Sequence, residues 1–268
     1  MFWAFLALIG LFIGAFGTLI GAAGGFLLVP ILLFLYPQDS PATITSITLT
    51  VAFCNALSGS IAYGHLRRID YRSGLTFAAA SVPGAIIGAN ITAALSRGIF
   101  EIVFAAVLLL VAGYLMFRPE RRGARAAGAF LVERRVTDRE GNTFTYAYNR
   151  VLGIGIAFFV GLLSGLLGIG GGIIHVPALT QLLNFPVYIA TATSHFVVAL
   201  TTFSAVITHV AQGIFTEGVG RAAVLSAGAI VGAQFGARFS HRVPGVLIVR
   251  LLAAGLAIVA LRLLIAGL

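Results

Sequence analysis

The residues of this sequence best suited to chemistry lie in two glycine-rich segments, 21–30 and 168–177, each inside a long apolar stretch and each ending in Val-Pro. Both have the spacing Gly-x-x-Gly-Gly, 147 positions apart. Unpaired backbone N–H groups at a helix start, reinforced by the helix dipole, bind small anions. Close helix packing explains an isolated Gly-Gly, but the repetition favours a site. The predicted anion-binding positions are Gly24, Gly25, Gly171 and Gly172.

A second repeated pair supplies hydroxyl groups. Thr45-Ser46 returns as Thr193-Ser194, near the start of another apolar run and 148 positions later. These hydroxyls can donate to an anion, so all four residues join the predicted substrate site. Hydroxyls in membrane helices also bond back to carbonyls of their own helix, and both roles stay open at this point.

Three histidines lie in apolar segments of the second half: His175, His195 and His209. An imidazole changes charge near neutral pH, so each is a candidate for carrying a proton or compensating the charge of an anion. Their position also places His175 and His195 in the predicted substrate site, while a simple hydrogen-bonded role remains the alternative. No carboxylate lies near them in sequence, so we expect no metal site, and no motif predicts a cofactor.

The elements that must position these groups are membrane helices. The chain has 268 residues, of which 59% are hydrophobic and 9% charged, and about 20 apolar residues span a bilayer. Two longer stretches, Met1–Tyr36 and Val151–Phe185, contain the glycine segments. The other predicted spans are Ala42–Gly64, Gly74–Leu95, Ile99–Phe117, Tyr188–Gln212, Val219–Ala237 and Val246–Ala266. We therefore predict an all-α integral membrane protein.

The repeats divide the chain into a first membrane repeat (1–117), a basic linker (118–150) and a second membrane repeat (151–268). Within the linker, residues 136–148 alternate around an Asp/Glu/Gly/Asn turn, which predicts a β-hairpin. A solvated connector is the favoured role of the linker, with a gating or regulatory element as the alternative. The net charge of +9 comes from arginines placed mostly between spans, which indicates membrane topology and argues against nucleic-acid binding.

The arginines also predict the orientation of the halves. The linker and the loop Gly64–Ser73 should be cytoplasmic, whereas in the second half the arginines lie one loop later, at Arg238–Pro244. This shift requires each glycine segment to fold as a helical hairpin, followed by three spans, with an extracytoplasmic N-terminus and inverted repeats. Inverted repeats with broken helices are typical of secondary transporters. One broken helix per half, giving parallel repeats, is the alternative.

The sequence resembles the TauE/SafE family, the sulfite exporter family. The resemblance rests on the twofold glycine segment, the repeated Thr-Ser, Ser58-Gly59 with the Gly64–Asp70 loop, and Gly84–Ala89 returning as Gly228–Ala233. It implies export of sulfite, sulfonates or other small organic anions across the inner (plasma) membrane, coupled to protons. The first segment has Ala23 where the second has Gly170, so the half-sites are expected to contribute unequally.

The function expected from these features is secondary active transport, by alternating access, of a small sulfur-containing or organic oxyanion. Its partners would be the anion, the lipid bilayer and a coupling proton, with oligomeric state open and a homodimer as one option. A passive anion channel is the alternative. An intramembrane enzyme ranks last, because the spans lack paired acids, a thiol beside a histidine motif and a His-Glu metal motif.

Overall fold

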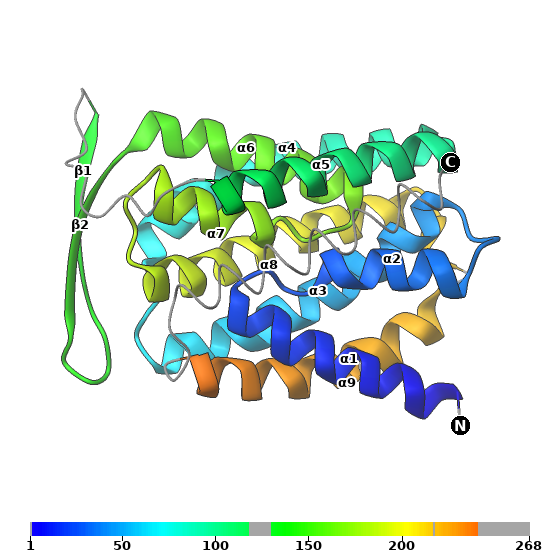
Figure 1. Cartoon of the computed structure of the whole chain (residues 1–268), viewed down its shortest axis with the longest axis horizontal. Coiled ribbons are helices and arrows are strands. Elements are labelled where there is room, and N and C mark those ends of the chain that lie inside the picture. The colour runs from blue at the N-terminus through cyan, green and yellow to red at the C-terminus, as the bar shows by residue number, and fades with distance from the viewer. Residues whose placement is uncertain (1, 118–129, 217, 241–268) are drawn as a thin grey trace.

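The computed structural model describes residues 2–117, 130–216 and 218–240, which form a bundle of helices with one β-hairpin at its end (Figure 1). The first half contains α1 (Phe2–Ile20), α2 (Gly25–Leu35), α3 (Pro41–His65), α4 (Tyr71–Ala94) and α5 (Arg97–Phe117). The hairpin consists of β1 (Leu131–Thr137) and β2 (Thr143–Asn149). The second half contains α6 (Arg150–Leu167), α7 (Gly172–Gln181), α8 (Val187–Ala211), the 3-10 turn η1 (Ile214–Thr216) and α9 (Val219–Phe239).

Six of the described helices, α1, α3, α4, α6, α8 and α9, are long and apolar enough to cross a membrane. The prediction of an all-α integral membrane protein is confirmed. Helix α5 covers the predicted span Ile99–Phe117, and the predicted span Val246–Ala266 lies outside the described residues.

Both glycine segments interrupt a helix. Residues 21–24 separate α1 from α2, and residues 168–171 separate α6 from α7. With 11 and 10 residues, α2 and α7 are too short to span the hydrocarbon core, which takes about 20. Each short helix turns back from the break along the helix before it, so both segments form helical hairpins (Figure 1).

Helices α3 and α8 form the centre of the bundle. Both have 72% of their most apolar window buried, the highest share among the candidate spans. Around them, α1 packs on α9 and α6 packs on α4, while α3 also contacts α9 and α8 contacts α4. The first helix of each half therefore packs against a late helix of the other half. Helices α1 and α6 run in opposite directions (Figure 1), which supports the prediction of inverted repeats.

Glycines make these reciprocal contacts close. A Cβ atom added at Gly165 in α6 would collide with the carbonyl oxygen of Ala85 in α4. On the other side of the bundle, a Cβ atom at Gly232 in α9 would collide with the carbonyl oxygen of Leu11 in α1. Small residues let backbones approach in membranes, where apolar surface alone gives helices little reason to associate. The repeated Gly-Ala-x-x-Gly-Ala motif lies along these two contacts.

Helix starts are set by local capping except at the breaks. The side chains of Ser40, Asp70 and Asn149 accept hydrogen bonds from the first turns of α3, α4 and α6. The residues that precede α2 and α7 are Gly24 and Gly171, which have left-handed φ angles of 75° and 77° and supply no side-chain cap. Only glycine adopts this conformation without strain, so the breaks depend on these residues.

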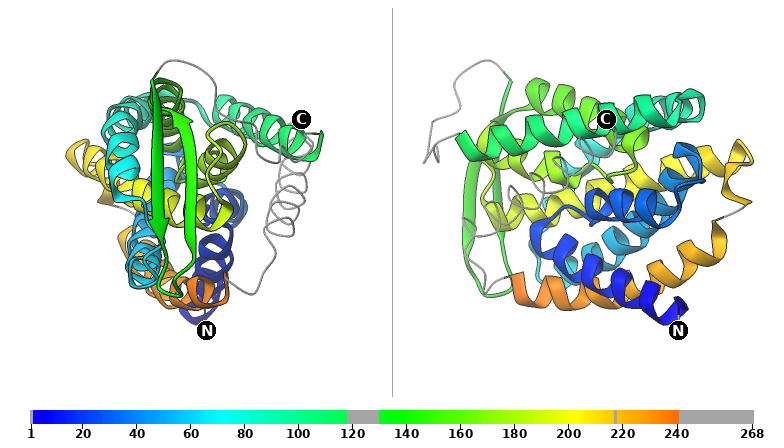
Figure 2. Two further views of the ribbon diagram at one scale, coloured as in Figure 1. Left: turned by 90° about the vertical axis from the view of Figure 1, so that its left-hand side faces the viewer. Right: turned by 45° about the vertical axis from the view of Figure 1, so that its right-hand side comes forward.

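The β-hairpin lies across the end of the bundle opposite the N-terminus (Figures 1 and 2). Its strands pair antiparallel with Arg134 opposite Tyr146. The N–H of Arg139 donates to the carbonyl of Leu66 at 3.0 Å, which places the hairpin against the loop between α3 and α4. The hairpin and this loop therefore lie at one end of the bundle, and the cytoplasmic location of the linker and the loop stays a prediction from their arginines.

Enlarging Gly165 should break the contact between α4 and α6. We expect Gly165→Leu to lower the Tm of the detergent-purified protein by about 2–12 °C, because overpacking a close contact costs about 1–3 kcal/mol. Gly155→Leu is the control, since Gly155 is an exposed residue of the same helix with no heavy atom near its Cβ position. Equal Tm values for the two variants would contradict a glycine-dependent contact.

Candidate functional site

The two breaks contact each other backbone to backbone inside the bundle. A Cβ atom added at Gly25 would lie 2.7 Å from the carbonyl oxygen of Gly168. A Cβ atom at Gly172 would collide with the carbonyl oxygen of Gly21. The contact is reciprocal, because Gly25 and Gly172 are separated by the same 147 positions as Gly21 and Gly168. Neither position accommodates a methyl group, so the starts of α2 and α7 can meet only as glycine.

This contact brings two helix N-termini together. Over the described residues, no hydrogen-bond acceptor serves the first N–H groups of either helix, those of Gly25, Phe26, Gly172 and Ile173. Each helix start carries the equivalent of about half a positive charge, and such ends bind anions. The structure thus brings each predicted helix start, at Gly25 and at Gly172, against the opposite break inside an apolar bundle.

The two breaks are not identical. Ala23 holds a left-handed φ of 52° where its counterpart Gly170 has 74°. A left-handed alanine costs roughly 1–2 kcal/mol, which the surrounding packing must offset. Ala23 is buried in a cluster of small side chains, Ala52, Ala56, Val198 and Ala199. The first break therefore carries a methyl group and strain that the second lacks, so the two half-sites differ in structure.

The hydroxyls of the first half bond back to their own helix. Thr45 Oγ1 and Ser46 Oγ donate to carbonyls three residues earlier in α3, at 3.1 and 2.7 Å. Thr45 nevertheless borders the second break, because a Cβ atom at Gly168 would lie 3.0 Å from its Cγ2. The structure thus brings Thr45 to the centre with its hydroxyl already engaged in the helix.

The hydroxyls of the second half reach other elements. Ser194 Oγ donates to the carbonyl of Gly21 at 3.3 Å and so ties α8 to the first break. Thr193 Oγ1 accepts from the backbone N–H of Asp70 at 3.0 Å, at the start of α4. The two Thr-Ser pairs therefore occupy equivalent positions in the repeat, but their side chains have different hydrogen-bond partners.

His195 is a buried histidine whose ring packs against α3. It is fully buried in α8, its ring lies 5.5 Å from that of Tyr63, and a Cβ atom at Gly59 would lie 2.5 Å from its Cδ2. Its Nε2 has no hydrogen-bond partner within the described part of the chain. It follows Ser194 directly in α8, and the hydroxyl of Ser194 donates to the carbonyl of Gly21 in the first break.

The other two histidines occupy different places. The N–H of His175 donates to the carbonyl of Gly171 at 2.9 Å, so His175 lies in the first turn of α7, next to the second break. His175 in α7 packs its ring edge-on against Phe77 in α4, at 5.9 Å. His209 is fourteen residues beyond His195, or about 21 Å along α8. Both are buried. His195 and His209 therefore cannot belong to one site. If both carried protons, they would do so at separate positions along α8.

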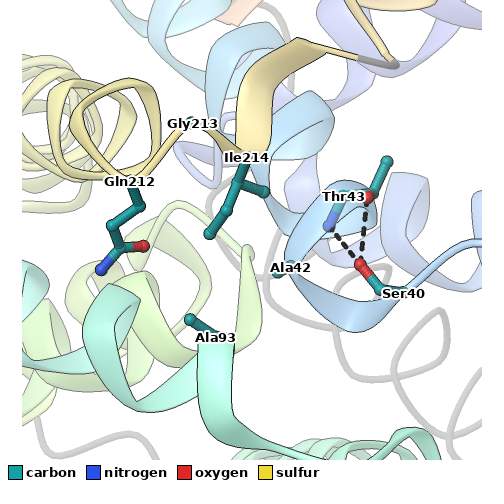
Figure 3. Close-up of a pocket in the computed structure, with 7 residues that line it drawn as sticks. All are labelled: Ser40, Ala42, Thr43, Ala93, Gln212, Gly213 and Ile214. Atoms are coloured by element: carbon teal, nitrogen blue, oxygen red, sulfur yellow. Dashed lines mark hydrogen bonds between the residues drawn. The ribbon is translucent and has the colours of Figure 1, made fainter.

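An open cleft of about 600 Å³ enters the bundle from the end opposite the hairpin. Figure 3 shows Ala93 and Gln212 on one side of the cleft and Ser40 and Thr43 on the other. Ser46, a predicted site residue, is buried one turn of α3 beyond the cleft, and its Oγ donates to the carbonyl of Thr43 at 2.7 Å. The cleft residues are Ser40, Ala42, Thr43, Ala93, Gln212, Gly213 and Ile214.

The other end of the bundle is closed by a polar network that sequence analysis missed. Asp70 is 2% exposed and accepts two hydrogen bonds from Arg134 of β1, at 2.6 and 2.9 Å, and one from the Tyr146 hydroxyl at 2.8 Å. Burial alone would raise the pKa of Asp70, but the bonds from Arg134, Ser73 and Tyr146 outweigh it and hold that pKa below its usual value. Through its backbone N–H, Asp70 also connects the hairpin to Thr193.

Broken helices whose N-termini meet inside a bundle of membrane-spanning helices, with a cleft from one end, are the architecture of membrane transporters. The sequence profile described as Sulfite exporter TauE/SafE matches residues 6–263. The chain therefore belongs to the TauE/SafE family, and it is a transmembrane transporter of that type.

Its relatives agree with this assignment. A probable membrane transporter protein of Bacillus subtilis is 35% identical over 219 residues, which cover 80% of each chain. A probable membrane transporter protein of Methanocaldococcus jannaschii is 27% identical over 80% of this chain and 73% of its own. One from Haemophilus influenzae is 29% identical over 66% of this chain and 60% of its own. No solved structure matches.

Adding a methyl group to either helix start should separate the two breaks. We expect Gly25→Ala and Gly172→Ala each to lower the transport rate per reconstituted protein at least tenfold, because the new Cβ meets the backbone of the opposite break. Gly98→Ala, where a Cβ atom would have no neighbour within 4 Å, is the control. Near-normal transport by both variants would show that the contact between the breaks is dispensable.

Protonating Asp70 should release the hairpin. Because the pKa of Asp70 is lowered by folding, its contribution is present above the unfolded value of about 3.9 and is lost as the pH falls through the folded value. We expect hydrogen exchange in β1 and β2, corrected for intrinsic rates, to accelerate below about pH 4. Asp70→Asn should already exchange fast at pH 7, unlike Glu133→Gln, which changes an exposed carboxylate of β1. Equal protection in the two variants would count against this role.

Proposed function

We propose that the protein is a secondary active transporter that exports a small sulfur-containing or organic oxyanion, such as sulfite or a sulfonate, with coupling to protons. The observation that carries the proposal is the meeting of the uncapped starts of α2 and α7 at the two breaks. The anion would bind to backbone N–H groups at Gly24, Gly25, Gly171 and Gly172, with Ser194 beside them.

The charge distribution favours an anion over a cation. The first N–H groups of each helix start have no acceptor among the described residues, and such donors suit an anion. The helices that surround them, α1, α2, α3, α6, α7 and α8, contain no aspartate or glutamate. A sodium or cation path built on carboxylates would need such residues within the membrane.

The two ends of the bundle differ in the way that alternating access requires. Thr43 lines the open cleft, and Thr191, which is 148 positions later, lies in a narrow closed pocket at the hairpin end. One half would thus expose the site to one side while the other half closes it. An open cleft at one end and a narrow pocket at the other fit alternating access better than a passive channel, which would be open at both ends.

The hairpin end is the proposed cytoplasmic side. Four exposed arginines lie there, Arg67, Arg72, Arg135 and Arg139. At the opposite end, Arg97 pairs with Glu101 at 2.8 Å and Arg221 with Asp39 at 2.6 Å, which leaves less net positive charge. Positive charge favours the cytoplasmic face, so the cleft would open to the outside and the N-terminus would be extracytoplasmic, in the inner membrane.

Purified protein in liposomes loaded with a pH-sensitive dye tests the proposal directly. Sulfite, sulfoacetate, taurine, sulfate, thiosulfate and lactate would be added in turn, with and without an imposed pH gradient. Proton movement that depends on one of these anions would establish coupled transport and its substrate class. Anion flux that ignores the pH gradient would support the channel, and absence of flux for every anion would refute the proposal.

His195 is the first proposed proton carrier, because its Nε2 has no partner in the described part of the chain, with His175 and His209 as further candidates. We expect His195→Gln to abolish anion-driven proton movement while leaving anion exchange within about threefold, because glutamine keeps a polar side chain that cannot titrate. His65→Gln, at an exposed histidine of α3, is the matched control. Unchanged proton movement in His195→Gln would assign the proton to another residue.

A further inference from the structure

A buried guanidinium lies in the closed pocket at the hairpin end. After α3 the chain turns through Arg67, whose left-handed φ of 53° leaves its own side chain exposed and directs Arg68 into the bundle. Arg68 is 5% exposed. Around its guanidinium the pocket is lined by Leu19, Tyr63, Tyr188, Thr191 and Ser240.

This guanidinium has few partners for its five donors. Among the described residues, its Nε and Nη1 have no hydrogen-bond acceptor. Its Nη2 lies 3.6 Å from carboxylate oxygens of both Asp138 and Glu140, which is beyond ordinary hydrogen-bond length. Its Cζ lies 5.5 Å from the ring centre of Tyr188. Buried charges are normally paired and hydrogen-bonded, so the free donors mark a place for an acceptor.

The pocket supplies one more donor and continues to the breaks. Thr191 is 3% exposed, and its Oγ1 likewise has no partner in the described part of the chain. Its Cγ2 lies 3.0 Å from the Cβ position of Gly21, and it precedes Ser194 by nearly one helical turn. An anion held by Arg68 would therefore be separated from the first break by about one turn of α8.

We propose that Arg68 and Thr191 form a second anion subsite, at the hairpin end of the pathway, for the same class of small oxyanion that the breaks receive. In the closed conformation, Asp138 and Glu140 from the turn of the hairpin face the guanidinium in place of that anion. The identity of the ligand as the transported anion rests on the proposed function.

The hairpin then acts as a competitor for Arg68 as well as a cover. Asp138 is held in its turn by the N–H groups of Glu140 and Asn142, at 3.0 and 2.9 Å. The Glu140 side chain is 62% exposed, so solvent screens its attraction to Arg68. Of the two carboxylates, Glu140 is therefore the easier one for an anion to displace. An oxyanion, with several acceptor oxygens, satisfies the free Nε and Nη1 donors that these carboxylates leave unpaired.

Transport measured separately from each side tests the subsite. In vesicles of defined orientation, Arg68→Gln should raise the KM for sulfite presented at the hairpin side at least tenfold, with less than a twofold change from the opposite side. The hairpin-side KM of Arg68→Lys should lie between those of the wild type and Arg68→Gln. Glu140→Gln should lower the hairpin-side KM two- to threefold. Arg72→Gln, at an exposed arginine of the same end, should change neither KM.

A purely structural role for Arg68 predicts a different result. If the residue only anchors the hairpin, Arg68→Gln should reduce the maximal rate equally from both sides with unchanged KM, and that outcome overturns the proposal. Should Arg68→Gln fail to fold, Thr191→Val removes the other donor while keeping the side-chain shape. It should raise the hairpin-side KM at least threefold, and no change there overturns the proposal too.

A binding measurement separates failure of the subsite from failure of the proposed function. If the wild-type protein transports none of the anions, binding of labelled sulfite to the purified full chain still tests the subsite. It would be measured by equilibrium dialysis at low ionic strength. Binding that is lost in Arg68→Gln but kept in Arg72→Gln supports the subsite. Equal binding by both variants, or no binding to the wild-type protein, overturns it.

Discussion

The structure depends on a backbone contact between two breaks that lack side chains at the point where they meet. Gly25 packs against the carbonyl oxygen of Gly168, and Gly172 packs against the carbonyl oxygen of Gly21. Because no methyl group fits at either position, each helix start reaches van der Waals contact with the opposite break, and its first N–H groups have no acceptor among the described residues. Backbone of this kind is tolerated at membrane depth only where protein or a wet cavity surrounds it. The remaining helices provide that surrounding.

The packing around the breaks follows from the same constraint. Helices α3 and α8 flank the breaks and are the most buried spans, while the glycine contacts of α1 with α9 and of α4 with α6 close the bundle on both sides. Each contact joins one half of the chain to the other. The broken hairpin of each half is therefore packed against a helix of the other half.

The two ends of the bundle differ because only one carries the linker. The hairpin brings Arg134 and Tyr146 to Asp70, and Asp70 in turn contacts Thr193 through its backbone. At the opposite end a cleft of about 600 Å³ remains open. A protein whose membrane halves are related by a repeat thus acquires distinct ends from a segment that occurs once, and Arg68 lies where that segment meets the bundle.

The sequence by itself determined the helices, the breaks and the hairpin, because apolar length, glycine placement and strand alternation are local properties. It also assigned Gly25 and Gly172 to equivalent positions, whereas their contacts with Gly168 and Gly21 came from the tertiary structure. Only the tertiary structure decided the partners of the polar side chains. Arg134 binds Asp70 from 64 positions away, and Arg68 is buried because the residue before it adopts a left-handed φ. No local pattern encodes such pairings, because the directions of side chains at a turn depend on what packs against that turn.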